Sequence, residues 1–549
     1  MERSKDVSTQ HATVIALLDY AFERYANQPA YTCMGHTLTY AQIDELSKNF
    51  AAFLQQDLGM RPGQRIALQM PNILQYPVAL YGAWRAGLTV VNTNPLYTSR
   101  EIKHQLVDSG AQALVVLSNV AAEAAEIIAD TEVKQVVVTD IGDLHPQPKR
   151  SLLNFVVRYV KKMVPDFEFP QTIGFRQALD LGSRQALESP EDIHGESNLV
   201  LQYTGGTTGL AKGAMLTHNN LCANVRQLVD HMPDLFVDKN LVFAAPLPLY
   251  HVYAFNIHAL AGFSKGAHNV LIPNPRDIKA VVATLKKHPP TVFIGLNTLF
   301  NALCRSEAFA RLDFSKLTCT SSGGMALTDS TAKCWKEITG VDIVEGYGLT
   351  ETSPVVSSCQ IGRIRRGTVG TALPDTEVKV VDEAGNTLDV GEVGELCIRG
   401  PQVMQGYWQK PEATAEVLSA DGWFKSGDMA TIDAEGFIKI VDRKKDMIIV
   451  SGFNVYPNEV EDVASQHPGV IEAAAIGLPD AKSGELVKLY VVRANDSVTE
   501  QEIQDYCREN MTAYKVPKIV EFRDSLPKSN VGKILRRSLR DEEMLRVKK

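Results

Sequence analysis

The feature that most constrains this chain is a regular alternation of short apolar runs with amphipathic stretches over its first two-thirds. The apolar runs have the length of strands, as at 65–70, 112–117 and 134–139. Helical candidates such as 40–58 and 77–86 lie between them. Strands that alternate with helices of this length are typical of parallel sheets with crossover helices. We therefore predict an α/β fold of packed sheets.

The pattern changes in the last third of the chain. Short strands at 378–381, 394–399 and 437–441 are separated by glycine, aspartate and asparagine turns, which is typical of a small antiparallel unit. A run of five charged residues follows, and the rest mixes helix with strand. A chain of 549 residues is too long for one hydrophobic core. We predict a large N-terminal domain over 1–442 and a small, mobile α+β C-terminal domain over 443–549.

Charge and cysteine content exclude several classes of protein. The formal net charge is −8 at pH 7, whereas a protein whose main partner is nucleic acid needs a basic excess. No apolar run reaches the ~18 residues of a membrane span. The eight cysteines are scattered and form no CxxC pair, which is typical of thiols in a reducing compartment. We expect a cytoplasmic protein without a nucleic-acid partner.

A segment rich in glycine and threonine lies between a predicted strand at 197–203 and a predicted helix at 218–232. Its glycines allow the backbone to approach a ligand closely with inward N–H groups, and its hydroxyls and lysine add donors and charge. It is not a Walker A loop, because no GK[ST] follows a glycine at the required distance. An ordinary loop explains such a turn as well as a phosphate site does. The candidate residues are Thr204, Gly205, Gly206, Thr207, Thr208, Gly209 and Lys212.

Further motifs follow this segment in order. They are Gly-Gly-Met at 323–325, Tyr-Gly-Leu-Thr-Glu at 347–351, Gly-Glu-Leu-Cys-Ile-Arg-Gly at 394–400, Lys-Ser-Gly-Asp at 425–428, Asp-Arg at 442–443 and Pro-Lys-Ser-Asn-Val-Gly-Lys at 527–533. Together they resemble the adenylate-forming superfamily, which contains acyl-CoA synthetases, firefly-type luciferases and the adenylation domains of peptide synthetases. The resemblance runs from about 38 to 533. The stretch 436–461 is most similar to bacterial long-chain fatty acid–CoA ligases.

The resemblance implies a reaction in two halves. A fatty acid carboxylate attacks the α-phosphorus of ATP and releases pyrophosphate, and the thiol of coenzyme A then attacks the acyl adenylate and releases AMP. ATP, Mg²⁺ and CoA are therefore the expected cofactor and co-substrates. The alternatives are a medium-chain or aryl acid–CoA ligase of the same superfamily, and a non-catalytic acyl-binding relative. The pattern is compatible with a homodimer.

The resemblance also assigns residues to the first half-reaction. Lys533 matches the lysine that reaches the α-phosphate and the substrate carboxylate. Glu351 and the hydroxyl of Thr204 match the Mg²⁺ ligands. Asp428 would accept hydrogen bonds from the ribose, with Arg443 as reinforcement. The other positions expected to contact the nucleotide are Tyr203, Gly323, Gly324, Gly346, Tyr347, Gly348 and Thr350.

Because Lys533 would belong to the small domain, that domain must move between the two half-reactions. Lys445 matches the hinge position of the family. In the second conformation Ser451 and Gly452 would border the tunnel that admits the pantetheine arm of CoA.

The acyl group requires an apolar pocket, and the segment 293–300 is apolar with a central glycine. Phe293, Leu299 and Phe300 are the candidates for its wall, and His251 is the candidate that orients the carboxylate. An ordinary hydrophobic core explains the same residues equally well. The stretch 246–255 contains no carboxylate that could bind an amino group, which disfavours amino-acid activation.

The segment 149–164 is basic and amphipathic. On a helical wheel Leu153, Val156, Val157, Val160 and Val164 share one face, and a second face gathers the polar residues Arg150, Asn154, Arg158, Lys161 and Lys162. A basic amphipathic helix with aromatic residues is typical of an interfacial membrane binder. A surface helix packed on the large domain is the alternative. The first interpretation predicts peripheral docking on an anionic inner membrane.

Overall fold

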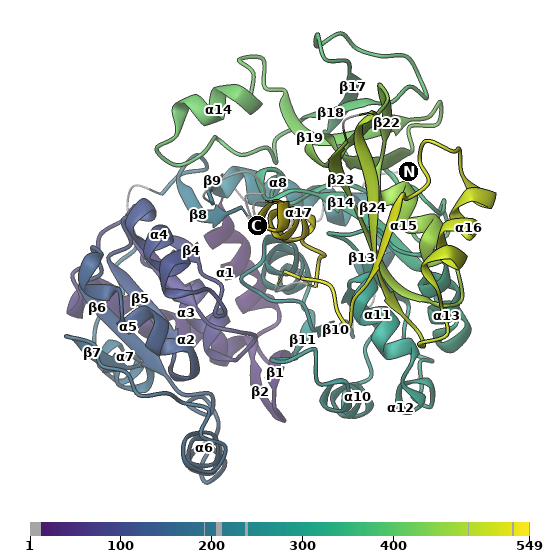
Figure 1. Cartoon of the computed structure of the whole chain (residues 1–549). Helices are drawn as coiled ribbons and strands as arrows, with labels where there is room; N and C mark the ends of the chain where they lie inside the picture. The colour runs from purple at the N-terminus through teal and green to yellow at the C-terminus, as the bar shows by residue number, and fades with distance from the viewer. Residues whose placement is uncertain are drawn as a thin grey trace.

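The computed structural model describes residues 13–190, 193–204, 211–236, 240–480, 482–529 and 532–547. A large N-terminal part contains three sheets, and a smaller C-terminal part contains a fourth (Figure 1). The predicted α/β class is confirmed.

The first sheet of the large part has seven strands in the order β7-β6-β5-β3-β4-β8-β9. All neighbours are parallel except the last pair, β8 and β9, which form a hairpin. This hairpin flanks the predicted phosphate-binding segment. The strands are β3 (Arg65–Gln69), β4 (Thr89–Asn92), β5 (Ala113–Leu117), β6 (Gln135–Thr139), β7 (Thr172–Gly174), β8 (Asn198–Tyr203) and β9 (Gly213–Thr217).

The second sheet has nine strands in the order β16-β15-β14-β13-β12-β10-β11-β1-β2. Its centre is parallel, and strand β1 from the start of the chain pairs in parallel with β11. The strands are β1 (Pro29–Cys33), β2 (His36–Thr39), β10 (Val242–Ala245), β11 (His268–Leu271), β12 (Val292–Gly295), β13 (Cys319–Ser322), β14 (Ile343–Gly348), β15 (Val355–Ser358) and β16 (Thr371–Ala372).

Helices connect and cover these two sheets. One large core cluster joins residues of both sheets with residues of α1, α2, α3 and α8. Sequence signals place the helix starts: Thr39 with Gln42, and Thr217 with Asn220, form capping boxes for α2 and α8. The helices are α1 (Val14–Arg24), α2 (Tyr40–Ala52), α3 (Gln75–Arg85), α4 (Ser99–Ser109), α5 (Ala121–Ala125), α6 (Lys149–Phe155), α7 (Phe175–Gly182), α8 (His218–His231), α9 (Val252–Ala254), α10 (Ile278–Lys287), α11 (Asn297–Cys304), α12 (Glu307–Ala310), α13 (Asp329–Thr339) and α14 (Pro411–Val417).

The chain then forms the predicted antiparallel unit, as a sheet of four strands: β17 (Glu377–Val381), β18 (Gly394–Arg399), β19 (Phe424–Ile432) and β20 (Ile438–Arg443). The strand β19 was not among the predicted ones. After one turn of 3₁₀ helix at Lys444–Asp446, the strands join a different sheet. Sheet membership therefore changes at the run of charged residues.

The C-terminal sheet has its own hydrophobic core and is flanked by α15, α16 and α17. Its long hairpin of β23 and β24 is antiparallel, and β25 joins β24 in parallel. The elements are β21 (Ile448–Val450), β22 (Phe453–Val455), α15 (Pro457–Ser465), β23 (Val470–Asp480), β24 (Gly484–Arg493), α16 (Glu500–Asn510), β25 (Ile519–Phe522) and α17 (Arg536–Val547).

The predicted amphipathic helix exists, but its faces differ from the prediction. It consists of α6 and a π-helical turn at Val156–Val160, and it projects from the body of the large part (Figure 1). Asn154 and Arg158, predicted on the polar face, are half-buried: Asn154 donates to Asp143 and Arg158 donates to Asp140. The π-helical turn also changes the register, so Val160 is exposed.

In the part of the chain that the structure describes, no helix is long and apolar enough to cross a membrane.

Candidate active site

A cavity of about 1910 Å³ lies between the large part and the C-terminal part. It exceeds the ~300–1,000 Å³ of a typical small-molecule site, so it has room for more than one ligand. Both parts of the chain line it, including the ends of β13 and β14, the strand β19, and the loop that precedes α17. This is the region where the predicted site residues were expected to meet.

The two ends of the predicted phosphate-binding segment meet at this cavity. The backbone N–H of Thr204 donates to the carbonyl of Lys212 at 3.0 Å, which closes the end of the β8–β9 hairpin. Both residues line the cavity. The intervening candidates Gly205, Gly206, Thr207, Thr208 and Gly209 lie outside the described residues.

Glu351 extends into the cavity beside the end of β14. Its carboxylate accepts a hydrogen bond from the hydroxyl of Tyr407 at 2.8 Å, and the ammonium of Lys212 lies 4.6 Å from the centre of the same Tyr407 ring. Burial raises the pKa of Glu351 above its usual value. A nearby cation would offset that desolvation, since opposite charge favours the ionised carboxylate.

Asp428, Tyr347 and Arg443 form a hydrogen-bonded chain on another wall. Asp428 is 2 % exposed; it accepts from the Tyr347 hydroxyl at 2.5 Å and from Nε of Arg443 at 2.6 Å. Strands β19 and β20 pair Asp428 directly with Arg443, which explains why two distant motifs meet. The carboxylate is therefore held in a fixed orientation at the cavity surface.

Three of the predicted glycines stand where a larger residue would be strained or would clash. Gly324 has a φ of +80°, which favours glycine. A Cβ on Gly323 would lie 3.1 Å from the ring of Tyr253, and one on Gly348 would lie 2.0 Å from the carbonyl of Pro354. These glycines, together with Gly346 and Thr350, line the cavity.

Lys533 reaches the cavity from the loop before α17. That loop lies against α11, because a Cβ on Gly532 would come within 2.7 Å of Oγ1 of Thr298. Lys533 is an exposed residue that lines the cavity, but the surrounding walls remove much of the solvation of its ammonium. This desolvation, and then the charge of Arg443, lower the pKa of Lys533 to about 8, against the opposing effect of Asp428.

The apolar residues that line the cavity differ from the predicted ones. Phe293 and Phe300 are buried against Trp335 in a separate core cluster, with Leu299 packed on it. They do not line the cavity because β12 and α11 turn these side chains toward α13. The apolar lining instead includes Leu228, Met232, Leu247, Val252, Ile257 and Val355.

His251 does line the cavity, as predicted. Its ring caps α9 by accepting from the backbone N–H of Tyr253 at 3.4 Å. Burial, and then the charge of Lys533, lower its pKa to about 4. The imidazole is therefore neutral at physiological pH.

Three other predicted residues are placed less directly. The hydroxyl of Tyr203 donates to Asp108 at 2.8 Å, so it is engaged by α4 at the edge of the cavity. Lys445 lines the cavity within the 3₁₀ turn after β20. Ser451 and Gly452 form the exposed turn between β21 and β22 and do not line it.

Sequence reasoning missed Tyr407 and Arg536. Tyr407 contacts both Glu351 and Lys212, and Gly406-Tyr-Trp408 in a loop was the available signal. Arg536 follows Lys533 by three positions and lines the same cavity. Its partners lie far away in sequence, so no local pattern identifies it.

Comparison with known proteins agrees with this architecture. The family model described as AMP-binding enzyme matches residues 18–408, and the AMP-binding enzyme C-terminal domain matches 459–533. A protein of Escherichia coli O157:H7 named long-chain-fatty-acid–CoA ligase is 51% identical over 97% of this chain and 95% of its own length. A protein of the same name from Bacillus subtilis strain 168 is 36% identical over 97% of this chain and 94% of its own length.

Among solved structures, an anthranilate CoA ligase in complex with anthranoyl-AMP superposes with a TM-score of 0.86. It is 26% identical, and the match covers 98% of both chains. The fold and the cavity thus define a two-domain adenylate-forming architecture. The chain belongs to the AMP-binding enzyme family.

The pKa of Lys533 leads to a pH prediction. Below about pH 8 the side chain is an ammonium, and above it the charge is lost. The first half-reaction, in which the acyl adenylate forms, is expected to need that charge. The value of kcat/KM for ATP should then be constant near pH 7 and fall about tenfold per pH unit well above pH 8. This parameter reports the pKa values of the free enzyme. Rates of pyrophosphate release from pH 6 to 10 would measure this. In Lys533→Arg the descending limb should move to higher pH; an unchanged limb would assign it to another group.

The placement of Phe300 generates a second prediction. Phe300→Ala should lower the free energy of unfolding by about 3–5 kcal/mol, the usual cost of deleting a buried aromatic ring. The preference of the Phe300→Ala variant among acids of different chain length should stay as in the wild type. Denaturant melts and relative kcat/KM values for two acids would test this. A changed chain-length preference with unchanged stability would support the original prediction that Phe300 lines the acyl pocket.

Proposed function

We propose that this chain is an AMP-forming long-chain fatty acid–CoA ligase. One observation carries the proposal: Lys533, from the loop before the last helix, enters the same cavity as Glu351 and the Asp428–Arg443 pair. An acid–thiol ligase needs a cation beside the nucleotide at this point, because charge develops on the phosphate oxygens in the transition state. The 51% identity to a protein with this name supports the substrate class.

In this proposal ATP lies along the wall that carries the predicted nucleotide residues. The adenine would rest on the backbone of Gly323 and Gly324 near Tyr347. The ribose hydroxyls would donate to Asp428, whose position is fixed by its contacts with Tyr347 and Arg443. The phosphates would extend toward Thr204 and Lys212, with the segment between them as further donors.

Mg²⁺ suits the donors that the described residues offer. Magnesium commonly binds one or two carboxylates together with phosphate and water, and Glu351 with the hydroxyl of Thr204 provides such a set. The raised pKa of Glu351 fits a carboxylate whose counter-ion arrives with the nucleotide. When bound, the ion would neutralise charge on the phosphates.

The acid would bind with its chain against the apolar residues that line the cavity and its carboxylate toward Lys533. His251 lines the same cavity and supplies a neutral imidazole. Each buried CH₂ contributes roughly 0.8 kcal/mol, so affinity should climb with chain length until the apolar lining is covered. Lys533 would then neutralise the pentavalent phosphorus centre as the carboxylate attacks.

The second half-reaction requires a different arrangement of the small domain. We propose that the domain comprises 443–549 and turns about Lys445, where the chain leaves one sheet for the next. The turn at Ser451 and Gly452 would then approach the cavity and border the path of CoA. Such closure also excludes water from the hydrolysable adenylate.

An aryl acid–CoA ligase is the competing candidate, because the superposed structure carries that activity in its name. The two differ in how the rate depends on the acid. Pyrophosphate release from ATP should climb from acetate to oleate and turn over repeatedly only with CoA present. Coumarate should be a poor substrate. Saturation by coumarate or short acids alone would favour the competitor, and no release with any acid would leave a non-catalytic acyl-binding protein.

We also propose that the helix at 149–160 with the residues just after it docks on anionic membrane. Its solvent-facing stripe is apolar and aromatic: Leu152, Phe155, Tyr159, Val160 and Met163 are each more than half exposed. The exposed Lys161 and Lys162 follow directly. An apolar stripe with adjacent lysines suits an interface of acyl chains and anionic headgroups.

Flotation with phosphatidylglycerol vesicles tests this docking. Lys161→Glu/Lys162→Glu and Phe155→Ser/Tyr159→Ser should each reduce the vesicle-bound fraction at least fivefold, while ligase turnover with a soluble acid stays unchanged. Arg158 should be left intact, because its ion pair with Asp140 holds the helix in place. Lys279→Glu/Lys286→Glu on α10 is the matched control. Equal binding by all variants would contradict the proposal.

A further inference from the structure

Asp442 is a buried carboxylate in β20, just before the proposed hinge. Its side chain is fully buried. It lines the same cavity as Lys533. Apart from the adjacent backbone N–H of Arg443, its hydrogen-bond partners lie in α15 and α17 of the C-terminal part. Nη1 of Arg536 in α17 lies 3.1 Å from Oδ1, and the backbone N–H of Asn458 in α15 donates to Oδ2 at 2.6 Å. Both contacts cross from one side of Lys445 to the other.

Arg536 is held in the orientation that this contact needs. Glu461 accepts from its Nε at 2.7 Å and from its Nη2 at 2.6 Å. This bidentate pair is confined to the C-terminal part, so it persists wherever that part moves. It leaves Nη1 free to point at Asp442, with Asp446 3.6 Å away. A guanidinium fixed in this way loses little entropy on making one further bond.

Lys533 lies three positions before Arg536, the first residue of α17. Its backbone is held by Ser529, which accepts from the Lys533 N–H at 3.1 Å and donates its own N–H to the Lys533 carbonyl at 2.7 Å. Any displacement of the start of α17 therefore moves the ammonium that the first half-reaction needs. The contact between Arg536 and Asp442 is an ion pair that joins this helix to the large part.

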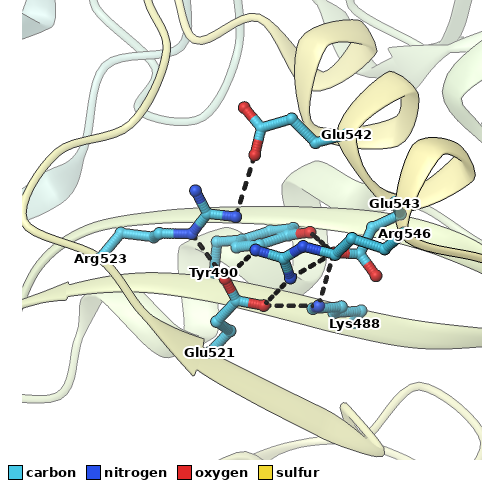
Figure 2. Close-up of polar contacts among 7 residues, drawn as sticks. All are labelled: Lys488, Tyr490, Glu521, Arg523, Glu542, Glu543 and Arg546. Atoms are coloured by element: carbon cyan, nitrogen blue, oxygen red, sulfur yellow. Dashed lines mark hydrogen bonds and ion pairs between the residues drawn. The ribbon is translucent and has the colours of Figure 1, made fainter. Parts of the chain in front are cut away.

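The rest of α17 is attached to its own sheet by a separate network, shown in Figure 2. Lys488 of β24 lies 2.9 Å from Glu543 and 2.7 Å from Glu521, and Tyr490 donates to Glu543 at 2.8 Å. Arg546 reaches Glu521 at 2.9 Å. These contacts stay within the C-terminal part, so α17 moves with that part as one body.

We propose that Asp442 is the docking point that holds the C-terminal domain in its adenylation position, with Arg536 and Asn458 as positioning residues. The proposal rests on the ligase activity and the hinge at Lys445 put forward above. Rotation about Lys445 would separate Asp442 from both partners. The contact therefore stabilises the conformation that places Lys533 at the α-phosphate and opposes the other one.

The decisive variants are Asp442→Asn and Arg536→Gln. Asp442→Asn keeps the shape of the side chain and leaves the Arg536–Glu461 pair intact. This variant should therefore fold even if Arg536→Gln does not. Arg546→Gln removes the same group from the same helix without touching Asp442 and is the matched control. Lys533→Ala is the reference for a lost first half-reaction.

Two single-turnover assays separate the half-reactions: acyl-AMP formation from acid and ATP, and thioester formation from supplied acyl-AMP and CoA. Asp442→Asn and Arg536→Gln should lower the rate of adenylation at least tenfold with an unchanged KM for ATP. Their thioester step should stay within twofold of wild type, and Arg546→Gln should stay within twofold in both. Three results would each overturn the proposal. They are equal losses of rate in both half-reactions, a raised KM for ATP with unchanged kcat, and an unaltered rate of adenylation.

Trypsin cleavage after Arg443, Lys444 or Lys445 gives a readout that needs no activity. The two variants should be cut at least threefold faster than wild type and Arg546→Gln, since the hinge is less often closed. Equal cleavage rates would overturn the docking role. A wild-type chain that releases no pyrophosphate would overturn the proposed ligase instead, and the cleavage assay would still decide the docking.

Discussion

The site depends on bringing the ammonium of Lys533 into a cavity that already contains the guanidinium of Arg443. Lys533 loses solvation there and faces the like charge of Arg443, and both effects lower its pKa. Asp428 opposes them, and a polyphosphate would do so more strongly because it brings several negative charges. The arrangement favours the complex with nucleotide over the empty site, since the phosphates stabilise the charged lysine in place more than Asp428 alone does.

Much of the fold follows from the sequence because its signals are local. Alternating strands and helices, capping residues such as Thr39 and Thr217, and the turn-rich strands after the parallel sheets all act within a few residues. The motif glycines are equally local, since Gly348 packs against Pro354 only six residues away.

The parts that sequence could not supply depend on which face of an element is covered. Phe300 and Val355 are both apolar, and only the tertiary structure turns one toward Trp335 and the other toward the cavity. Arg158 faces inward because Asp140 lies beneath it, a partner eighteen positions away on another element. Arg536 likewise needed the folded positions of Glu461 and Asp442 before its role could be seen.

The place of β1 in the nine-stranded sheet has a consequence for how the chain folds. The register of β1 with β11 sets Tyr31 beside Asn269. The first strand therefore cannot complete this pairing until the middle of the chain has been synthesised. Contacts this distant in sequence slow folding, and an unpaired apolar strand invites association with other chains. Until β11 is made, the N-terminal hairpin is an exposed edge. Chaperone demand during synthesis should therefore be concentrated in the interval between these two strands.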